Sequence, residues 1–169
     1  MGLISTKIVQ YIQWWPSMLR VGKLTDYGTV VMTSFARQPQ RLHSANELAA
    51  ELGLALPTVS KVLKALVQHG LLVSHRGAKG GYSLAAPPEE ISVAQIIAAI
   101  EGPIALTECS DSTGHCGQEP QCSVRGNWQR INRAVQEALE RVTLAELARP
   151  MAQPLRFTTS EMLSRAEGI

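Results

Sequence analysis

Apolar residues recur at helical spacing in the front half of the chain and predict three successive helices. The first apolar stripe is Leu24, Tyr27, Val31 and Phe35. Pro39 ends that run, because proline cannot continue a helix. Ser44 and Glu47 then have the spacing of a capping box and predict the start of a short second helix. Gly53 marks its end, since glycine accepts the left-handed backbone that commonly closes a helix.

The third predicted helix begins at Pro57, whose fixed φ suits a first helical turn, and stops before Gly70. Its buried face consists of Val59, Val62, Leu63, Leu66 and Val67. Hydroxyl, amide and basic side chains occupy the opposite face: Thr58, Ser60, Lys61, Lys64 and Gln68. Two helices joined by a short glycine-containing turn, the second with such an outer face, are typical of a DNA-binding helix-turn-helix. On this stretch alone, an ordinary helical hairpin with solvated lysines is an equal alternative.

A short β-hairpin is predicted directly after the third helix, with strands at 72–76 and 82–84 and a glycine-rich turn at 77–81. Such a hairpin forms a wing, which contacts phosphates or the minor groove while the preceding helix enters the major groove. The predicted DNA contacts are Thr58, Ser60, Lys61, Lys64, Arg76 and Lys79. We expect those on the helix to lie near base edges and those on the hairpin to hold the DNA backbone.

Two further helices are predicted in the back half. Ser92 caps one that carries Val93, Ile96, Ile97 and Ile100, and Gly102 closes it. We expect this helix to pack on the winged unit. The apolar stripe of the other is Trp128, Ile131, Val135, Leu139 and Val142. It resembles a coiled-coil seam, which on one subunit would have to be covered by another, so we expect a homodimer. Packing within the same chain is the less favoured alternative. Thr143 and Glu146 form a second capping box and predict a new short helix.

Charge is unevenly distributed along the chain. Its formal net charge is only +2, but residues 18–83 carry eight Lys and Arg against three acids, and residues 84–169 carry seven against eleven. A basic front half favours an anionic partner such as DNA. No run of about 18 apolar residues is present, which argues against a membrane span. We find no phosphate-binding glycine loop, nucleophile–base signature or pair of catalytic carboxylates, so we do not expect an enzyme.

Three cysteines lie in a polar, glycine-containing stretch: Cys109, Cys116 and Cys122. An odd number of cysteines is a poor disulfide framework and is typical of the reducing cytoplasm, where we expect the protein to be. Soft thiolates favour zinc, copper(I) or iron–sulfur clusters. The gaps of six and five residues lack the close pairs of a structural zinc site. The residues by themselves leave a cluster, zinc and plain thiols equally favoured, and His115 is too close to Cys116 to bind the same iron without strain.

Several motifs combine along the chain: Leu19-Arg20-Val21, residues 23–32, Gly70-Leu71-Leu72, Arg76-Gly77-x-x-Gly80-Gly81-Tyr82-x-Leu84, the three cysteines and Thr143-Leu144-x-Glu146-Leu147. With these motifs, the chain from Met18 to about Ala148 resembles the iron–sulfur-dependent winged-helix regulators typified by IscR and NsrR. Residues 23–32 look most like the branch that regulates the SUF cluster-assembly operon.

The resemblance implies a homodimer in which Cys109, Cys116 and Cys122 hold an iron–sulfur cluster that alters promoter binding. In IscR the fourth ligand is a histidine three residues after the last cysteine, where this chain has Arg125, which cannot serve. In NsrR it is an aspartate of the first helix, contributed by the partner subunit, and Asp26 occupies that position. A first-turn carboxylate favoured by the helix dipole is the rival interpretation of Asp26. The resemblance favours [2Fe–2S] over [4Fe–4S]. The recognition helix of IscR carries a glutamate where this chain has Ser60, so its operator sequence does not transfer.

The sequence as a whole predicts a mainly α protein with a small β-hairpin wing: a winged helix-turn-helix followed by a long dimerisation helix. We expect an N-terminal extension at 1–17, a DNA-binding domain at 18–86, a cluster loop and dimerisation helix at 87–148, and a flexible tail at 149–169. The expected function is cluster-dependent regulation of iron–sulfur assembly genes through double-stranded promoter DNA. A zinc-stabilised winged-helix repressor and a cluster carrier that never binds DNA are the alternatives.

Overall fold

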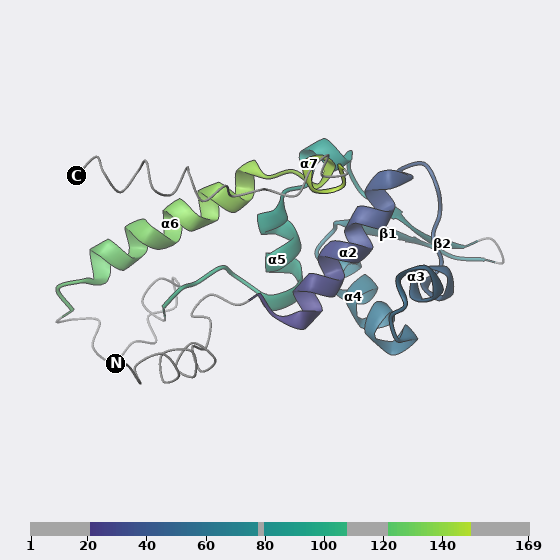
Figure 1. The fold of residues 1–169 in the computed structure, drawn as a ribbon, viewed down its shortest axis with the longest axis horizontal. Coiled ribbons are helices and arrows are strands. Elements are labelled where there is room, and N and C mark those ends of the chain that lie inside the picture. Colours follow the sequence, from purple (N-terminus) through teal and green to yellow (C-terminus); the bar gives the residue numbers. More distant parts are fainter. Residues whose placement is uncertain (1–20, 78–79, 108–121, 150–169) are drawn as a thin grey trace, which may run out of the picture.

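The computed structural model describes residues 21–77, 80–107 and 122–149, which fold mainly into helices. The elements are α2 (Lys23–Arg37), α3 (Ala45–Leu52), α4 (Leu56–Gln68), β1 (Leu72–His75), β2 (Gly81–Leu84), the 3₁₀ turn η1 (Pro88–Glu90), α5 (Val93–Glu101), α6 (Arg125–Arg141) and α7 (Leu144–Leu147). Figure 1 shows α6 projecting away from a compact group formed by the other elements. The predicted fold class, mainly α with a two-stranded antiparallel hairpin, is confirmed.

The predicted helix starts are formed by hydrogen bonds between side chains and backbone. The Ser44 hydroxyl accepts from the Glu47 N–H at 3.2 Å, and the Glu47 carboxylate accepts from the Ser44 N–H at 2.9 Å. Ser92 and Thr143 cap α5 and α7 in the same reciprocal way. Gly53 adopts φ +63°, the left-handed conformation predicted for the end of α3. These local signals therefore act as the sequence indicates, because each satisfies amides or carbonyls that a helix end leaves unpaired.

One apolar core holds the compact group together. Its fully buried side chains come from every helix around it: Val31, Met32, Phe35, Leu48, Val59, Val62, Leu63, Leu66, Ile96 and Leu144. The predicted buried faces of α2 and α4 are thus confirmed, and Val67 is half-buried against the same core. Because α5 contributes Ile96 to this core, its predicted packing on the winged unit is also confirmed.

The hairpin is joined to the loop between α2 and α3. Strands β1 and β2 pair in the register Leu72↔Leu84 to His75↔Gly81. In addition, the His43 N–H donates to the Tyr82 carbonyl at 3.0 Å, and the Tyr82 N–H donates to the His43 carbonyl at 2.9 Å. Gly81 is required beside this bridge, since a Cβ there would lie 2.8 Å from the His43 carbonyl oxygen. The sequence analysis did not foresee this third pairing, which fixes the hairpin relative to α2 and α3.

Helix α6 is attached to the compact group mainly at its C-terminal end. The Val93 N–H donates to the Val142 carbonyl at 2.9 Å, and the Leu144 N–H donates to the Ile91 carbonyl at 2.7 Å. Within the described residues, most of the predicted apolar stripe is uncovered: Trp128, Ile131 and Val142 are 37%, 47% and 38% exposed. None of the described helices is long and apolar enough to cross a lipid bilayer.

Candidate nucleic-acid interface and metal-ligand residues

The outer face of α4 is polar and accessible. Ser60, Lys61 and Lys64 are exposed, whereas Thr58 is half-buried. They face outward because the side chains on the opposite side of the helix are buried in the core: Val59, Val62, Leu63 and Leu66. No acidic residue lies in the first turn of α4, and its N-cap, Ala55, has no side chain that could bond the free amides. The helix therefore presents hydroxyls and lysines, a surface suited to an anionic polymer.

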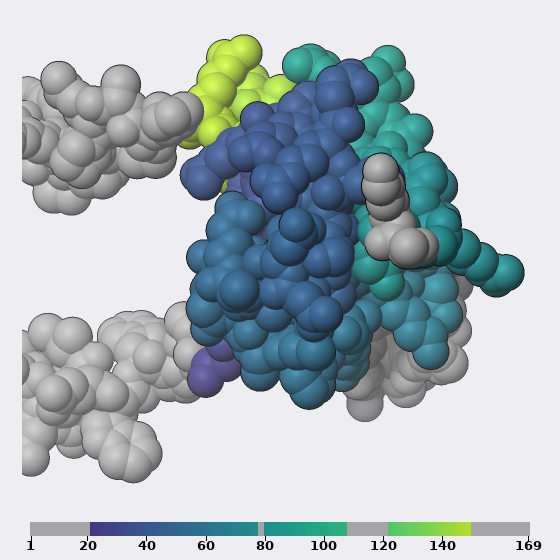
Figure 2. Space-filling view, turned by 90° about the vertical axis from the view of Figure 1, so that its right-hand side faces the viewer, coloured from purple at the N-terminus to yellow at the C-terminus, as the bar shows by residue number. Residues whose placement is uncertain are grey.

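The hairpin lies beside α4, as a wing requires. Strand β1 contacts α4 directly, and the end-on view in Figure 2 shows α3 and α4 in blue next to the hairpin strands in teal. His75 Nε2 lies 2.9 Å from the Ser83 hydroxyl and links the two strands near the tip. Arg76 follows β1 and is exposed, so it places a positive charge on the surface of the hairpin. Lys79 lies outside the described residues.

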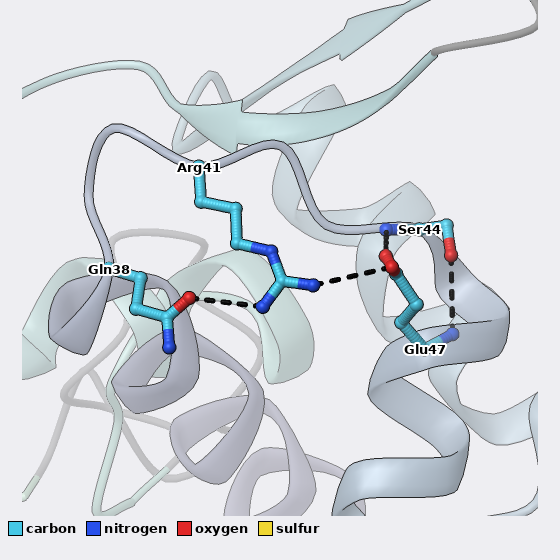
Figure 3. A network of polar contacts seen from close by, with 4 residues as sticks. All are labelled: Gln38, Arg41, Ser44 and Glu47. Atoms are coloured by element: carbon cyan, nitrogen blue, oxygen red, sulfur yellow. Dashed lines mark hydrogen bonds and ion pairs between the residues drawn. The ribbon is translucent and has the colours of Figure 1, made fainter.

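A polar network holds the start of α3 against the end of α2 (Figure 3). The Arg41 guanidinium donates to the Gln38 side-chain oxygen at 3.1 Å and to the Glu47 carboxylate at 3.3 Å. Hydrogen bonds from the Ser44 backbone and hydroxyl lower the pKa of Glu47 below its ordinary value, and the charge of Arg41 acts in the same direction. The network keeps Glu47 ionised and α3 oriented, and α3 in turn packs against α4.

The structure describes two of the four predicted metal ligands. Asp26 is exposed on the first turn of α2, and its carboxylate forms no hydrogen bond or ion pair within the described part of the chain. Cys122 is half-buried just before α6. Cys109 and Cys116 lie outside the described residues, and no three potential ligands come together in the parts that are described. A free carboxylate and a thiol are donors that iron accepts, so the two described ligands fit the group that the resemblance implies.

Glu101 fastens the start of α2 to the end of α5. Its carboxylate oxygen Oε1 accepts from the Gly22 N–H at 2.9 Å and from the Thr25 hydroxyl at 2.6 Å. Thr25 is fully buried and precedes Asp26. Glu101 is also the last residue of α5, after which the chain continues to the segment that carries the cysteines. Sequence reasoning missed it, although a carboxylate in the last turn of a helix opposes the helix dipole and usually has a specific partner.

Asn132 holds the segment at 104–106, which leads to the cysteines, on α6. Its side-chain oxygen accepts from the Leu106 N–H at 3.0 Å, and its amide donates to the Ile104 carbonyl at 3.0 Å. The side chain is only 7% exposed. Sequence reasoning missed Asn132 too. The available signal was its position four residues after Trp128, which puts an amide on the same side of the helix as the apolar stripe.

A helix-turn-helix with a basic outer face and an adjoining hairpin defines the winged-helix class of DNA-binding proteins. Within that class, the family model described as "Iron-dependent Transcriptional regulator" matches residues 21–150, and the chain belongs to this family, Rrf2. It is therefore a DNA-binding transcriptional regulator of the winged-helix type.

Individual relatives agree with this assignment. The chain is 30% identical over 131 residues to the HTH-type transcriptional regulator NsrR of Oceanobacillus iheyensis, an alignment that covers 76% of this chain and 89% of the relative. Among solved structures, it is similar to CymR, the global cysteine regulator of B. subtilis, with a TM-score of 0.61 and 30% identity over 77% of this chain and 96% of CymR. The structure of T. potens IscR matches with a TM-score of 0.58 and 28% identity over 83% of this chain and 97% of IscR.

Proposed function

We propose that this regulator binds promoter DNA as a homodimer and that an iron–sulfur cluster sets how tightly it binds. The observation that carries the DNA-binding part is the exposed face of α4, with Ser60, Lys61 and Lys64 beside the wing. A helix with such a face fits the major groove, and the wing adds contacts to the DNA backbone.

In this proposal the residues of α4 and the wing have different tasks. Ser60, Lys61 and Lys64 contact base edges, and Thr58 contacts a base or a phosphate. Arg76 and Lys79 hold the DNA backbone. The lysines and arginine add affinity that does not depend on the DNA sequence and that weakens as salt rises.

Dimerisation is proposed through α6. Its exposed apolar side chains, among them Trp128 and Ile131, are costly to leave in water, and a second copy of the same stripe would cover them. Two recognition helices must lie about 34 Å apart to enter successive major grooves on one side of a palindromic site. The distance between the two α4 helices then depends on how the α6 helices pack.

The proposed cluster ligands are Cys109, Cys116 and Cys122 of one copy with Asp26 of the other, and [2Fe–2S] is favoured over [4Fe–4S]. A bound cluster would supply iron that reacts under oxidative or nitrosative stress. The fraction of protein that carries a cluster would follow how much cluster the cell provides. The carboxylate of Asp26 is free to serve, since it has no bond to another described residue. Three thiolates and one carboxylate are a weaker set for a cluster than four thiolates, which suits a sensor.

Two contacts in the chain itself offer a route from the cysteines to the DNA-binding face. Asn132 holds residues 104–106 on α6, and Glu101 holds the first turn of α2 on the end of α5. Helix α2 packs directly against α4. A change in the position of the cysteine segment can therefore reach α4 through α2, and reach the second copy through α6. The position of the cysteine segment defines two arrangements of the chain. Cluster binding shifts the equilibrium between them only by the difference in its affinity for the two.

We further propose that the regulated genes are those of iron–sulfur assembly, the SUF genes, and that the protein acts in the cytoplasm. The similarity of residues 23–32 to the SUF-regulating branch supports the first statement, and the free thiols expected of a reducing compartment support the second.

The test compares wild type with Cys116→Ala and Asp26→Ala, all purified without oxygen. Iron, sulfide and zinc are measured together with the visible spectrum, and promoter affinity is measured across a salt series. We expect a coloured, iron-containing wild type whose DNA affinity falls steeply with salt and changes when the cluster is removed. Cys116→Ala should lose the colour, and Asp26→Ala should shift the spectrum.

Each alternative gives a different result. Stoichiometric zinc in colourless protein that binds DNA would establish the zinc-stabilised repressor instead. A coloured protein with no salt-dependent DNA binding would be a cluster carrier. An unchanged spectrum in Asp26→Ala would remove that residue from the ligand set and leave the rest of the proposal intact.

A further inference from the structure

Leu56 is an exposed apolar side chain at the first position of α4. It is 42% exposed, whereas Val59, Val62, Leu63 and Leu66 of the same helix are fully buried. Val67 and the preceding Leu54 pack against the core, but Leu56 is absent from the core and from the half-buried side chains around it. The folding of α4 therefore does not account for a leucine at this position.

Leu56 lies on the same side of α4 as its exposed polar residues. Leu56, Ser60 and Lys64 follow one another at intervals of four residues, so they lie on the same side of the helix. Ser60 and Lys64 are exposed there. Leu56 is thus an apolar residue in the first turn of an otherwise hydroxyl-bearing and basic surface. In helix-turn-helix proteins, the N-terminal residues of the recognition helix are those that contact base edges.

Major-groove chemistry offers an apolar side chain one partner. Base edges present hydrogen-bond donors and acceptors, and the 5-methyl group of thymine is the apolar feature among them. A leucine cannot form hydrogen bonds with a base, but it can shield this methyl group from water.

We propose that Leu56 is a specificity-determining residue that contacts the 5-methyl group of a thymine in the DNA site. This inference rests on the proposed contact between α4 and the major groove, and it adds a base preference that Ser60, Lys61 and Lys64 do not supply. The contact removes one methyl group from water, which corresponds to about a four-fold gain in affinity. Leu56 therefore favours A·T over G·C at one position of each half-site.

The test replaces thymine by uracil, which differs only by the absence of the methyl group. Wild-type protein first selects its preferred duplex from a random pool. Each thymine of the selected site is then replaced singly by uracil, and affinity is measured for wild type and for Leu56→Ala. At one position per half-site, wild type should lose about four-fold on the uracil duplex. Leu56→Ala should bind the thymine duplex about four-fold more weakly than wild type and show no further loss on uracil at that position.

Leu147→Ala is the matched control, because Leu147 is also an exposed leucine, at 37%, but belongs to α7. It should keep the full sensitivity to uracil. The scan on wild type does not depend on any variant folding, and Leu56→Met provides a second variant that keeps an apolar side chain and should keep the sensitivity.

The failure of this inference differs from the failure of the proposed function. If wild type binds a selected duplex but no uracil replacement weakens it, or if Leu56→Ala keeps the same sensitivity as wild type, Leu56 has no such role while α4 still reads DNA. If wild type selects no sequence and shows no salt-dependent binding, the proposed function and the role of Leu56 are both wrong.

Discussion

Replacing Asn132 by alanine tests whether the chain leading to the cysteines is held on α6 by a single side chain. The substitution removes two hydrogen bonds of 3.0 Å each, one to the Leu106 N–H and one to the Ile104 carbonyl. Each bond contributes about 1 kcal/mol net to stability. Leu106 and Ile104 are half-buried, so water reaches the freed backbone groups in part and reduces the cost of leaving them unpaired. We expect a loss of about 2 kcal/mol in the free energy of unfolding, or about 4–8 °C in Tm.

The measurement is urea unfolding followed by circular dichroism, at one fixed protein concentration because dimerisation contributes to apparent stability. Gln136→Ala is the matched control: Gln136 lies one turn further along the same helix, is exposed and, among the residues that the structure describes, donates only to Glu140. It should change stability by less than about 0.5 kcal/mol. Asn132→Asp should be at least as destabilising as Asn132→Ala, because a second carboxylate oxygen would face the Ile104 carbonyl. Equal stability of Asn132→Ala and wild type would show that other contacts hold residues 104–106.

Three further predictions concern the winged unit. Gly53→Ala should lower the free energy of unfolding in urea by about 1 kcal/mol, because Gly53 has φ +63°, which alanine disfavours. Gly126→Ala, in the first turn of α6, should not lower it, and equal effects of the two changes would contradict a conformational cause. The pKa of Glu47 is lowered in the folded protein, so its contribution to stability is present above the ordinary value of 4.5 and is lost as pH falls below it. Glu47→Gln should therefore lose less stability than wild type between neutral and acid pH, and parallel curves would exclude this linkage. His43 is 2% exposed, neither ring nitrogen has a hydrogen-bond partner among the described residues, and the ring lies edge-to-face against Phe35 with the centroids 4.9 Å apart. His43→Leu keeps the backbone pairing with Tyr82 and should raise stability by about 1 kcal/mol, whereas a loss would show that the contact with Phe35 outweighs the unpaired ring nitrogens.

The features that sequence analysis missed share a physical cause. Glu101 bonds Gly22 and Thr25, which are 79 and 76 residues away along the chain, and Asn132 bonds Leu106 from 26 residues away. No periodicity or spacing rule links such distant positions, because their contact depends on how whole helices pack. The sequence also predicts that the third helix begins at Pro57, one residue after Leu56, so it assigns Leu56 to no helix face, whereas α4 begins at Leu56.

The sequence by itself determined the elements and their order. The reciprocal caps at Ser44, Ser92 and Thr143 and the left-handed turn at Gly53 are local, so neighbouring residues supply all their partners. The apolar stripes of α2, α4 and α5 are readable as a helical period, although their packing partners lie on other helices. Tertiary structure alone decided which polar groups far apart in the sequence meet. The pairing of His43 with Tyr82, the bonds from Glu101 to the start of α2 and the exposure of Leu56 exist only because α2, α4, α5 and the hairpin close around one core.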